Sequence, residues 1–100
     1  MQVQREVDIE APVDDVWEAL VTEDGRERWL QDEQRDRDIH IEVVDFPHRL
    51  VWWWLGEDEP ATRVEFELIA HPRGTRVIVR ESAPSFPVAA LAHCFAGAPA

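Results

Sequence analysis

The sequence TRVEFELIAHPRGTRVIVRES, residues 62–82, carries the clearest structural signal in the chain. Apolar and polar residues alternate on both sides of the segment His71-Pro72-Arg73-Gly74. Alternation with a period of two is typical of half-buried strands, and proline with glycine is typical of a turn. The stretch therefore predicts a β-hairpin with strands over residues 63–70 and 75–81.

The register of this hairpin can be tested by pairing Ala70 with Thr75 across the turn. The pairing sets apolar residues against each other on one face and opposite charges on the other: Leu68 opposite Val77, Phe66 opposite Val79, and Glu65 opposite Arg80. An opposite-charge pair of this kind contributes roughly 0.2–1 kcal/mol. Because a slip by one residue would turn every side chain to the other face, agreement on both faces supports this register.

A second hairpin is predicted around Pro47-His48, between an alternating segment over residues 39–44 and a strand over residues 49–55. If Phe46 closes this turn with Arg49, two further pairs follow: Val43 opposite Trp52 and Ile41 opposite Trp54. The register then separates the tryptophans by face. Trp52 and Trp54 point inward, and Trp53 points outward on the face of His40 and Glu42.

The N-terminal third predicts one strand and two short helices. Residues 3–9 alternate, with four residues on one face: Val3, Arg5, Val7 and Ile9. Ala11-Pro12 ends the strand, and apolar residues then recur at helical spacing: Val13, Val16, Trp17 and Leu20. A second short helix is predicted after Thr22, ending near Trp29-Leu30. The charged residues 31–38 form a connection, and residues 56–60 form a loop.

The tail predicts a short helix, because Val88, Leu91, Ala92 and Phe95 are spaced three and four residues apart. Prolines 84 and 87 limit its start, and Gly97 and Pro99 end it. The order is therefore strand, two short helices, antiparallel strands and a helix. This order indicates an α+β domain in which the last helix covers one face of the sheet.

Composition excludes several classes of protein. One hundred residues make one domain, and 10 basic residues, all arginine, against 21 acidic residues give a net charge of −11. This balance argues against nucleic acid and anionic membranes as partners. The single cysteine excludes an internal disulfide, and no apolar run reaches ~18 residues. The start MQVQREVDIE does not resemble a signal peptide, so we expect a cytoplasmic protein.

Three segments carry a resemblance to a known family: VDIEAPVDDVWEALVTEDGRERWL, VVDFPHRLVWWW, and the hairpin of residues 62–82. Over residues 3–82 the chain resembles the START-like superfamily, also called SRPBCC or helix-grip. The closest branch is that of bacterial homologues of the activator of heat-shock-protein ATPase, often labelled polyketide cyclase-like. The resemblance implies a helix-grip fold, with an antiparallel sheet of about five strands wrapped around the C-terminal helix. It predicts a single reduced domain over residues 1–100, because family members are longer and residues 31–38 cannot hold their two additional strands.

The candidate ligand-binding residues are those that would face a cavity under the last helix: Arg5, Trp17, Trp52, Trp54, Phe66 and Phe95. Aromatic side chains suit an apolar pocket, and an arginine offers fixed bidentate geometry to a carboxylate. The alternative for the aromatic residues is packing in the core of a small domain. The alternative for Arg5 is an ion pair with Glu81.

No catalytic residue, metal ligand set or cofactor motif is predicted. Asp36, Asp38, His40 and Glu42 alternate on one face, but residues two apart along a strand lie ~7 Å apart, too far for all four to bind one ion. His93 and Cys94 are adjacent on a helix, so their side chains diverge, and Cys94 is expected to be buried and inert. No serine triad and no dinucleotide fingerprint occurs. Arg5 and His93 remain as the candidates for acid–base chemistry.

Three functions stay open. The first is non-catalytic binding of a small hydrophobic ligand, with homodimer contacts in which Trp53 is the expected interface residue. The second is a protein-interaction module, as the resemblance to a chaperone ATPase activator implies. The third is a polyketide cyclase-like or lyase-like enzyme, which would need a general acid or base in the pocket.

Overall fold

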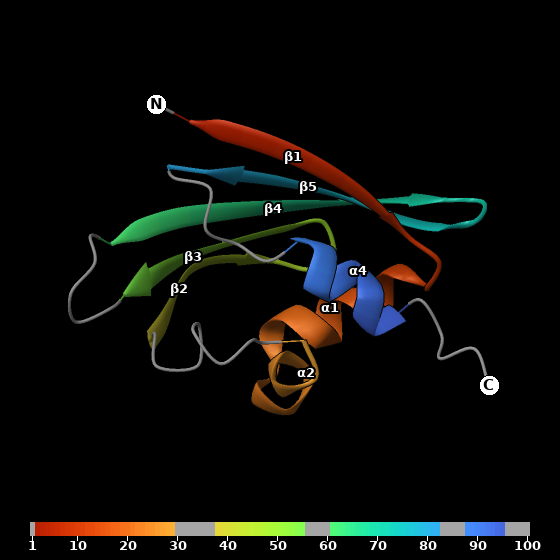
Figure 1. Ribbon diagram of the computed structural model, residues 1–100, viewed down its shortest axis with the longest axis horizontal. Coiled ribbons are helices and arrows are strands. Elements are labelled where there is room, and N and C mark those ends of the chain that lie inside the picture. Colours follow the sequence, from red (N-terminus) through yellow and green to blue (C-terminus); the bar gives the residue numbers. More distant parts are fainter. Residues whose placement is uncertain (1, 30–37, 56–60, 83–87, 96–100) are drawn as a thin grey trace.

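The computed structural model describes residues 2–29, 38–55, 61–82 and 88–95. Its strands are β1 Val3–Ile9, β2 Asp38–Asp45, β3 Arg49–Leu55, β4 Thr62–His71 and β5 Gly74–Glu81. Its helices are α1 Val13–Val21, α2 Glu23–Glu27 and α4 Val88–Phe95. The strands form one antiparallel sheet in the order β1-β5-β4-β3-β2, and the helices are grouped on one side of it (Figure 1). The predicted α+β architecture is confirmed.

The β4–β5 hairpin has the predicted register. Ala70 pairs with Thr75, and the three further pairs are present: Leu68 with Val77, Phe66 with Val79, and Glu65 with Arg80. The turn depends on Gly74, whose φ of 148° lies in a region that other residues rarely adopt. A side chain at Gly74 would also meet the carbonyl oxygen of Ile9, because the turn packs closely against the end of β1.

The predicted register of the β2–β3 hairpin is wrong, because the structure has a bulge. Asp45, not Phe46, pairs with Arg49, and Ile41 lies opposite Trp52 where Val43 was expected. The register shifts between Ile41 and Val43, which leaves one extra residue in β2 and places Val43 opposite Val51. Nothing in the alternation of residues 39–44 signals this extra residue, so the pattern predicts a regular ladder.

The predicted orientation of the three tryptophans is nevertheless confirmed. Trp52 and Trp54 are fully buried on the face that packs against the helices, which we call the inner face. Trp53 is half-buried on the opposite, outer face, where it pairs with His40 and its indole Nε1 donates to Glu42 Oε1 at 2.8 Å. The orientation is kept because the register at the tryptophans differs from the predicted one by two residues, and a shift of two leaves each side chain on the same face.

The helices α1 and α2 are joined by a capped turn. Thr22 Oγ1 accepts a hydrogen bond from Gly25 N at 2.9 Å, which satisfies one of the first amide groups of α2. Helix α2 ends at Glu27, two residues before the predicted end near Trp29. Trp29 itself is buried against the sheet, and its Nε1 donates to Ala19 O in α1 at 2.7 Å.

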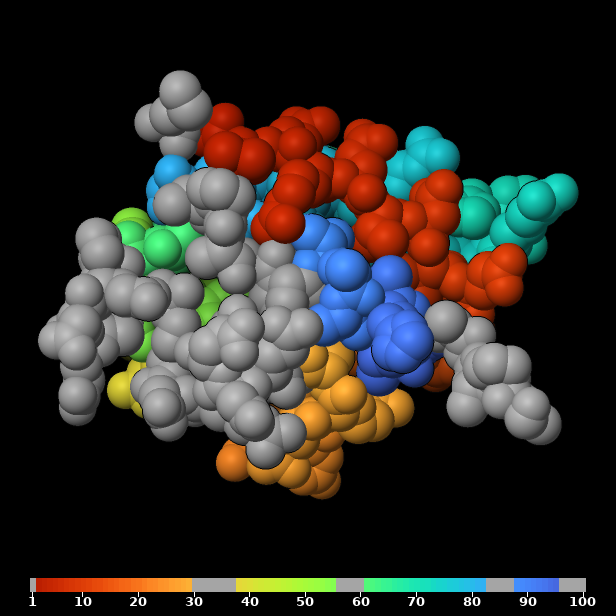
Figure 2. All heavy atoms as spheres, in the orientation of Figure 1, coloured from red at the N-terminus to blue at the C-terminus, as the bar shows by residue number. Residues whose placement is uncertain are grey.

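The last helix is the one that the apolar spacing of the tail predicts. Leu91 is fully buried, and three half-buried residues pack beside it on the core: Val88, Ala92 and Phe95. Figure 2 shows α4 lying directly against β1. Residues 31–37 of the predicted connection 31–38 lie outside the described residues, and its last residue, Asp38, begins β2. Also outside the described residues are the loop 56–60 and Pro84, Pro87, Gly97 and Pro99. Among the described residues, no helix has the length and apolar character needed to cross a membrane.

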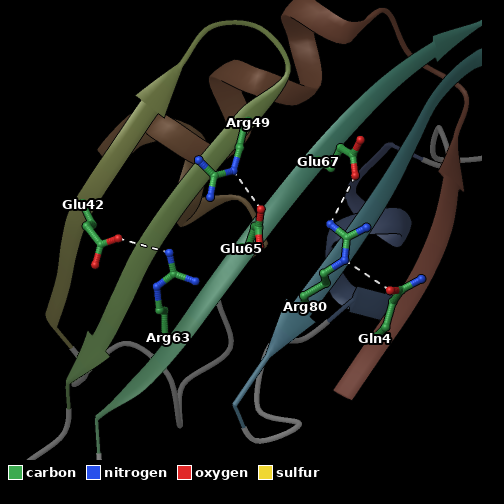
Figure 3. A network of polar contacts seen from close by, with 7 residues as sticks. All are labelled: Gln4, Glu42, Arg49, Arg63, Glu65, Glu67 and Arg80. Atoms are coloured by element: carbon green, nitrogen blue, oxygen red, sulfur yellow. Dashed lines mark hydrogen bonds and ion pairs between the residues drawn. The ribbon is translucent and has the colours of Figure 1, made fainter. Parts of the chain in front are cut away.

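The outer face carries rows of opposite charges that link neighbouring strands (Figure 3). Glu65 and Arg80 are opposite in register as predicted, but their ion pairs run to other partners. Glu65 accepts from Arg49 Nε at 2.8 Å, and Arg80 Nη1 lies 3.2 Å from Glu67 Oε1. Arg80 also donates to Gln4 of β1, so its side chain spans three strands. The outer face is therefore a polar surface without a cavity-forming layer over it in the described part of the chain.

Candidate functional site

The predicted aromatic residues of the sheet lie together on the inner face. The ring centroid of Trp52 is 4.6 Å from that of Phe66 and 5.7 Å from that of Trp54, both in edge-to-face geometry. All three side chains are fully buried. The three rings thus form an apolar floor beneath the helices, and they contact one another as core residues do. We call this set the aromatic floor.

Trp17 and Phe95 lie on the helices that cover the aromatic floor. Trp17, on α1, is buried and contacts Phe46 edge-on at a centroid distance of 5.3 Å. Phe95 closes α4 and is half-buried against the core. The guanidinium carbon of Arg28 lies 6.0 Å from the centre of the Phe95 ring, a cation–π geometry. Phe95 is therefore the predicted aromatic residue that lies nearest to the surface, because the other four are buried.

Arg5 forms the ion pair that was the alternative to ligand contact. Its Nη2 donates to Glu81 Oε1, and the Glu81 side chain is fully buried. The two residues lie on neighbouring strands β1 and β5 and are diagonal to each other, because Glu81 is two residues beyond Val79, the residue opposite Arg5. Since the positive charge of Arg5 is balanced by Glu81, a ligand carboxylate would have to compete with Glu81 for this guanidinium.

Two hollows flank α4. The first, of about 500 Å³, lies between α4 and the end of β1. Helix α4 lines it with Ala89, Ala92, His93 and Phe95, and the N-terminal segment lines it with Asp8, Ile9 and Glu10. We call it the β1–α4 hollow. It combines apolar surface with ionisable side chains, the composition usual for small-molecule sites.

The second hollow, of about 450 Å³, lies on the other side of α4, against the segment that follows α2. It shares Ala89 and His93 with the first and adds Arg28, Trp29 and Cys94. Cys94 is half-buried, so the expectation of a buried cysteine is wrong. The helix is short, and its last turn therefore leaves the sulfur at the margin of the core.

The carboxylates near these hollows differ in their partners. Arg76 Nε donates to Asp8 Oδ1 at 2.9 Å, and this hydrogen bond holds the pKa of Asp8 below its ordinary value. His71 lies 3.9 Å from the same oxygen and acts in the same direction. Glu10 has neither an ion pair nor a hydrogen bond from its side chain among the described residues. Asp8 is thus held in place, whereas Glu10 is available to an incoming group.

The remaining candidates are not brought together. Among the described residues, no three histidine, cysteine, aspartate or glutamate side chains are placed to hold a metal ion. Asp36 lies outside the described part of the chain. Trp53 lies on the outer face, away from the hollows, with its indole on Glu42. The sequence did not single out Glu10, Asp8 and Arg28, because charged residues are common on protein surfaces. Only the packing of α4 shows that these three residues line hollows.

Comparison with known proteins identifies structural relatives. No protein-family model matches the chain, and no curated protein matches it. Two structures of CalU16 from Micromonospora echinospora match at TM-scores of 0.77 and 0.62, with 21% and 25% identity, over 97% and 84% of this chain. The Aha1 dimer from Colwellia psychrerythraea matches at a TM-score of 0.70 and 18% identity, over 94% of this chain and 84% of that one.

DynU16, a protein of the dynemicin biosynthetic locus, matches at a TM-score of 0.65 and 26% identity over 96% of this chain. The chain spans only 66% and 58% of the two CalU16 chains and 42% of DynU16. These relatives share the sheet and the C-terminal helix that the resemblance implied. The chain has the helix-grip fold of START-like (SRPBCC) proteins, and its structure is similar to those of the Aha1 and CalU16 proteins.

Proposed function

We propose that this domain binds a small hydrophobic ligand without catalysing a reaction, under and beside α4. The observation that carries the proposal is that the short helix α4 packs against β1 and joins the same core as the aromatic floor through Leu91 and the half-buried residues beside it. Of the eight residues of α4, Leu91 is the buried one. A helix of this length is marginal by itself, so its position depends on these few contacts. Local opening would expose the aromatic floor to a ligand at low cost.

The distribution of ionisable groups supports binding rather than catalysis. Among the described residues, Glu81 is the one ionisable side chain in the buried set, and it is ion-paired with Arg5. A general acid or base must reach the substrate and exchange a proton with it. A carboxylate held by a guanidinium is poorly suited to that task. The aromatic floor itself offers aromatic and aliphatic surface, whereas the ionisable residues Asp8, Glu10 and His93 line the hollow beside α4.

Fluorescence of Nile red, an uncharged dye, tests the proposal. Its emission rises in apolar surroundings, and its lack of charge avoids general attraction or repulsion by a protein of net charge −11. We expect saturable binding to the wild-type chain. Ala89→Phe adds a ring at an exposed position that lines both hollows, so it should weaken dye binding several-fold. Ala61→Phe, at an exposed position away from α4, is the matched control.

Two results would contradict ligand binding beside α4. One is the absence of any saturable change in dye emission with folded wild-type protein. The other is equal weakening by Ala89→Phe and by Ala61→Phe, which would show that the dye binds elsewhere. Circular dichroism confirms that both variants are folded before the comparison is made.

We propose self-association as a second function, favoured by where the exposed apolar side chains lie. In the described part of the chain, four of the five large apolar side chains that are exposed belong to β2, to the turn that follows or to the end of β3: Ile41, Val44, Phe46 and Leu55. Val44 and Phe46 are 60% and 59% exposed. Such a concentration at one sheet edge is typical of an interaction surface. The solved Aha1 relative is a dimer, which supports a protein partner of the same kind.

Light scattering across protein concentration tests self-association. A dimer that dissociates in Val44→Ser but not in Ile69→Ser would place the contact at the β2 edge, since Ile69 is exposed on β4 instead. Loss of the dimer in Trp53→Ala would extend the contact to the outer face. A monomer at every concentration would contradict the proposal.

A further inference from the structure

We infer that the β1–α4 hollow selects ligands that carry a protonated amine on an apolar body. This inference rests on the proposed binding of a hydrophobic ligand beside α4, and it names the chemical class of that ligand. The ligand class follows from which surfaces of the hollow are apolar, which are charged, and which charges already have partners.

The apolar wall comes from both sides of the hollow. Ile9 is 2% exposed at the end of β1, and it supplies aliphatic surface at the base. Ala92 and Phe95 are half-buried on α4 and supply a methyl group and a ring. A volume of about 500 Å³ accommodates an alkyl or aryl group of modest size.

The charged wall is acidic. Asp8 and Glu10 flank Ile9 in sequence, and all three residues line the hollow, although the Asp8 side chain points to the outer face, where it pairs with Arg76. Arg76 occupies one oxygen of Asp8, so much of the Asp8 charge is already balanced. Glu10 makes no ion pair among the described residues, and a protonated amine would give it a charge-assisted hydrogen bond. Glu10 is therefore the group expected to recognise the amine.

The arginines nearby leave Glu10 without an ion pair in the described part of the chain: Arg76 is paired with Asp8, and Arg73 lines a neighbouring hollow that Glu10 also lines. Arg28 lines the second hollow and stacks on the Phe95 ring at 6.0 Å. His93 lines both hollows from α4. The net charge of −11 adds a field that concentrates cations at the surface and repels anions. Glu10 and the negative charge of the protein would repel a ligand that carries a carboxylate, whereas both would attract an ammonium group.

Calorimetric titration with three ligands of equal chain length tests the inference: octylamine, octanol and octanoate. At pH 7 they carry a positive charge, no charge and a negative charge. We expect octylamine to bind about tenfold more tightly than octanoate, a factor that corresponds to ~1.4 kcal/mol, with octanol between them. Glu10→Gln should remove most of this preference. Glu6→Gln changes the net charge equally from an exposed position on β1 outside the hollow, and it should leave the preference intact.

The outcomes separate this inference from the function on which it rests. Equal affinity for the three ligands would overturn amine selection and leave hydrophobic binding standing. Equal losses in Glu10→Gln and Glu6→Gln would also overturn it, because the preference would then come from the general field. Binding of none of the ligands would overturn both proposals. The titrations are made at 0.15 M salt, where the Debye length is ~8 Å, so that the electrostatic field of the whole protein is screened.

Discussion

The indole rings of Trp29 and Trp52 are stacked, with planes 4° apart and centroids 6.5 Å apart. Trp29 follows α2 and Trp52 lies in the middle of β3, so this contact joins the helical layer to the sheet. The Nε1 of Trp29 donates to Ala19 O, which ties α1 to the same point. The Trp29 side chain therefore links α1, the segment after α2 and β3, and its removal should weaken the packing of all three.

Replacement of Trp29 tests this joint. Trp29→Ala should lower the free energy of unfolding by about 3–5 kcal/mol, the range for deleting a buried aromatic side chain. Trp29→Phe should lower the free energy of unfolding less, because an aromatic ring still packs against Trp52. The remaining loss comes from the smaller ring and from the missing hydrogen bond to Ala19 O. Urea denaturation measures both, with Leu55→Ala at an exposed position as the control. A loss no larger than that of Leu55→Ala would show that Trp29 does not join the layers.

The ion pair between half-buried Arg5 and buried Glu81 leads to a prediction of non-additivity. Glu81→Leu alone leaves the Arg5 charge without its partner, and Arg5→Met alone leaves a fully buried carboxylate. Removing one member of a fully buried pair costs about 3–5 kcal/mol, and the loss here should be smaller because the Arg5 side chain is 33% exposed, whereas replacing both with apolar residues should cost least. The double variant should therefore be more stable than the sum of the single changes predicts. Strictly additive losses in urea denaturation would contradict a coupled pair.

The contact between Trp53 and Glu42 predicts a response to acid. The indole Nε1 of Trp53 and then Arg63 donate to Glu42, and they lower its pKa from the ordinary 4.5. A lowered pKa in the folded state means that this contribution to stability is present above pH 4.5 and is lost as pH falls through the folded value. The indole proton of Trp53 should shift in NMR spectra with a midpoint below pH 4.5. Glu42→Gln should abolish that transition, and a midpoint above the ordinary value would contradict the contact.

Gly74 should not tolerate a side chain. Its φ of 148° is strained for other residues, and a Cβ would meet the backbone at Ile9 and Ala11. Gly74→Ala should therefore destabilise the fold by at least ~1–3 kcal/mol, the cost of one residue held in a sparsely populated conformation. Ala70→Gly, at an exposed position in the same hairpin, controls for a general effect of substitution there. Thermal unfolding of the two variants makes the comparison.

The β4–β5 hairpin was predictable because two independent faces agree on one register. Leu68 with Val77 and Glu65 with Arg80 each support the same pairing, and the turn sequence fixes its length. The β2–β3 hairpin lacked such a check. Alternation there is compatible with a regular ladder, and the bulge between Ile41 and Val43 follows from tertiary fit rather than from a local signal.

The site was less predictable than the fold because its walls are distant in sequence. Aromatic residues in strands signal an apolar floor, and Trp52 and Trp54 were placed on the correct face. The β1–α4 hollow joins Glu10 to His93, and no periodicity relates two segments so far apart. Nor does a charge pattern show which carboxylate will lack a partner. That distinction arises only when Arg76 reaches Asp8 and leaves Glu10 aside.

The attachment of α4 through Leu91 provides a test that joins stability to function. Leu91→Ala should lower the free energy of unfolding by about 2–5 kcal/mol, because it deletes a fully buried side chain. If α4 is also the movable cover of the aromatic floor, its loosening should let Nile red reach that floor more readily while the sheet stays folded. Dye affinity should then rise in Leu91→Ala, although global stability falls.

The control must lose similar stability without loosening α4. Val64→Ala removes a fully buried side chain from β4, and it should lower stability without raising dye affinity. Equal dye uptake by Leu91→Ala and Val64→Ala would mean that the dye reports general unfolding. A rise in Leu91→Ala alone would mean that exposure of the aromatic floor is governed by α4. Hydrogen exchange of the β3 and β4 amides shows whether the sheet remains closed in both variants, which is the condition for the comparison.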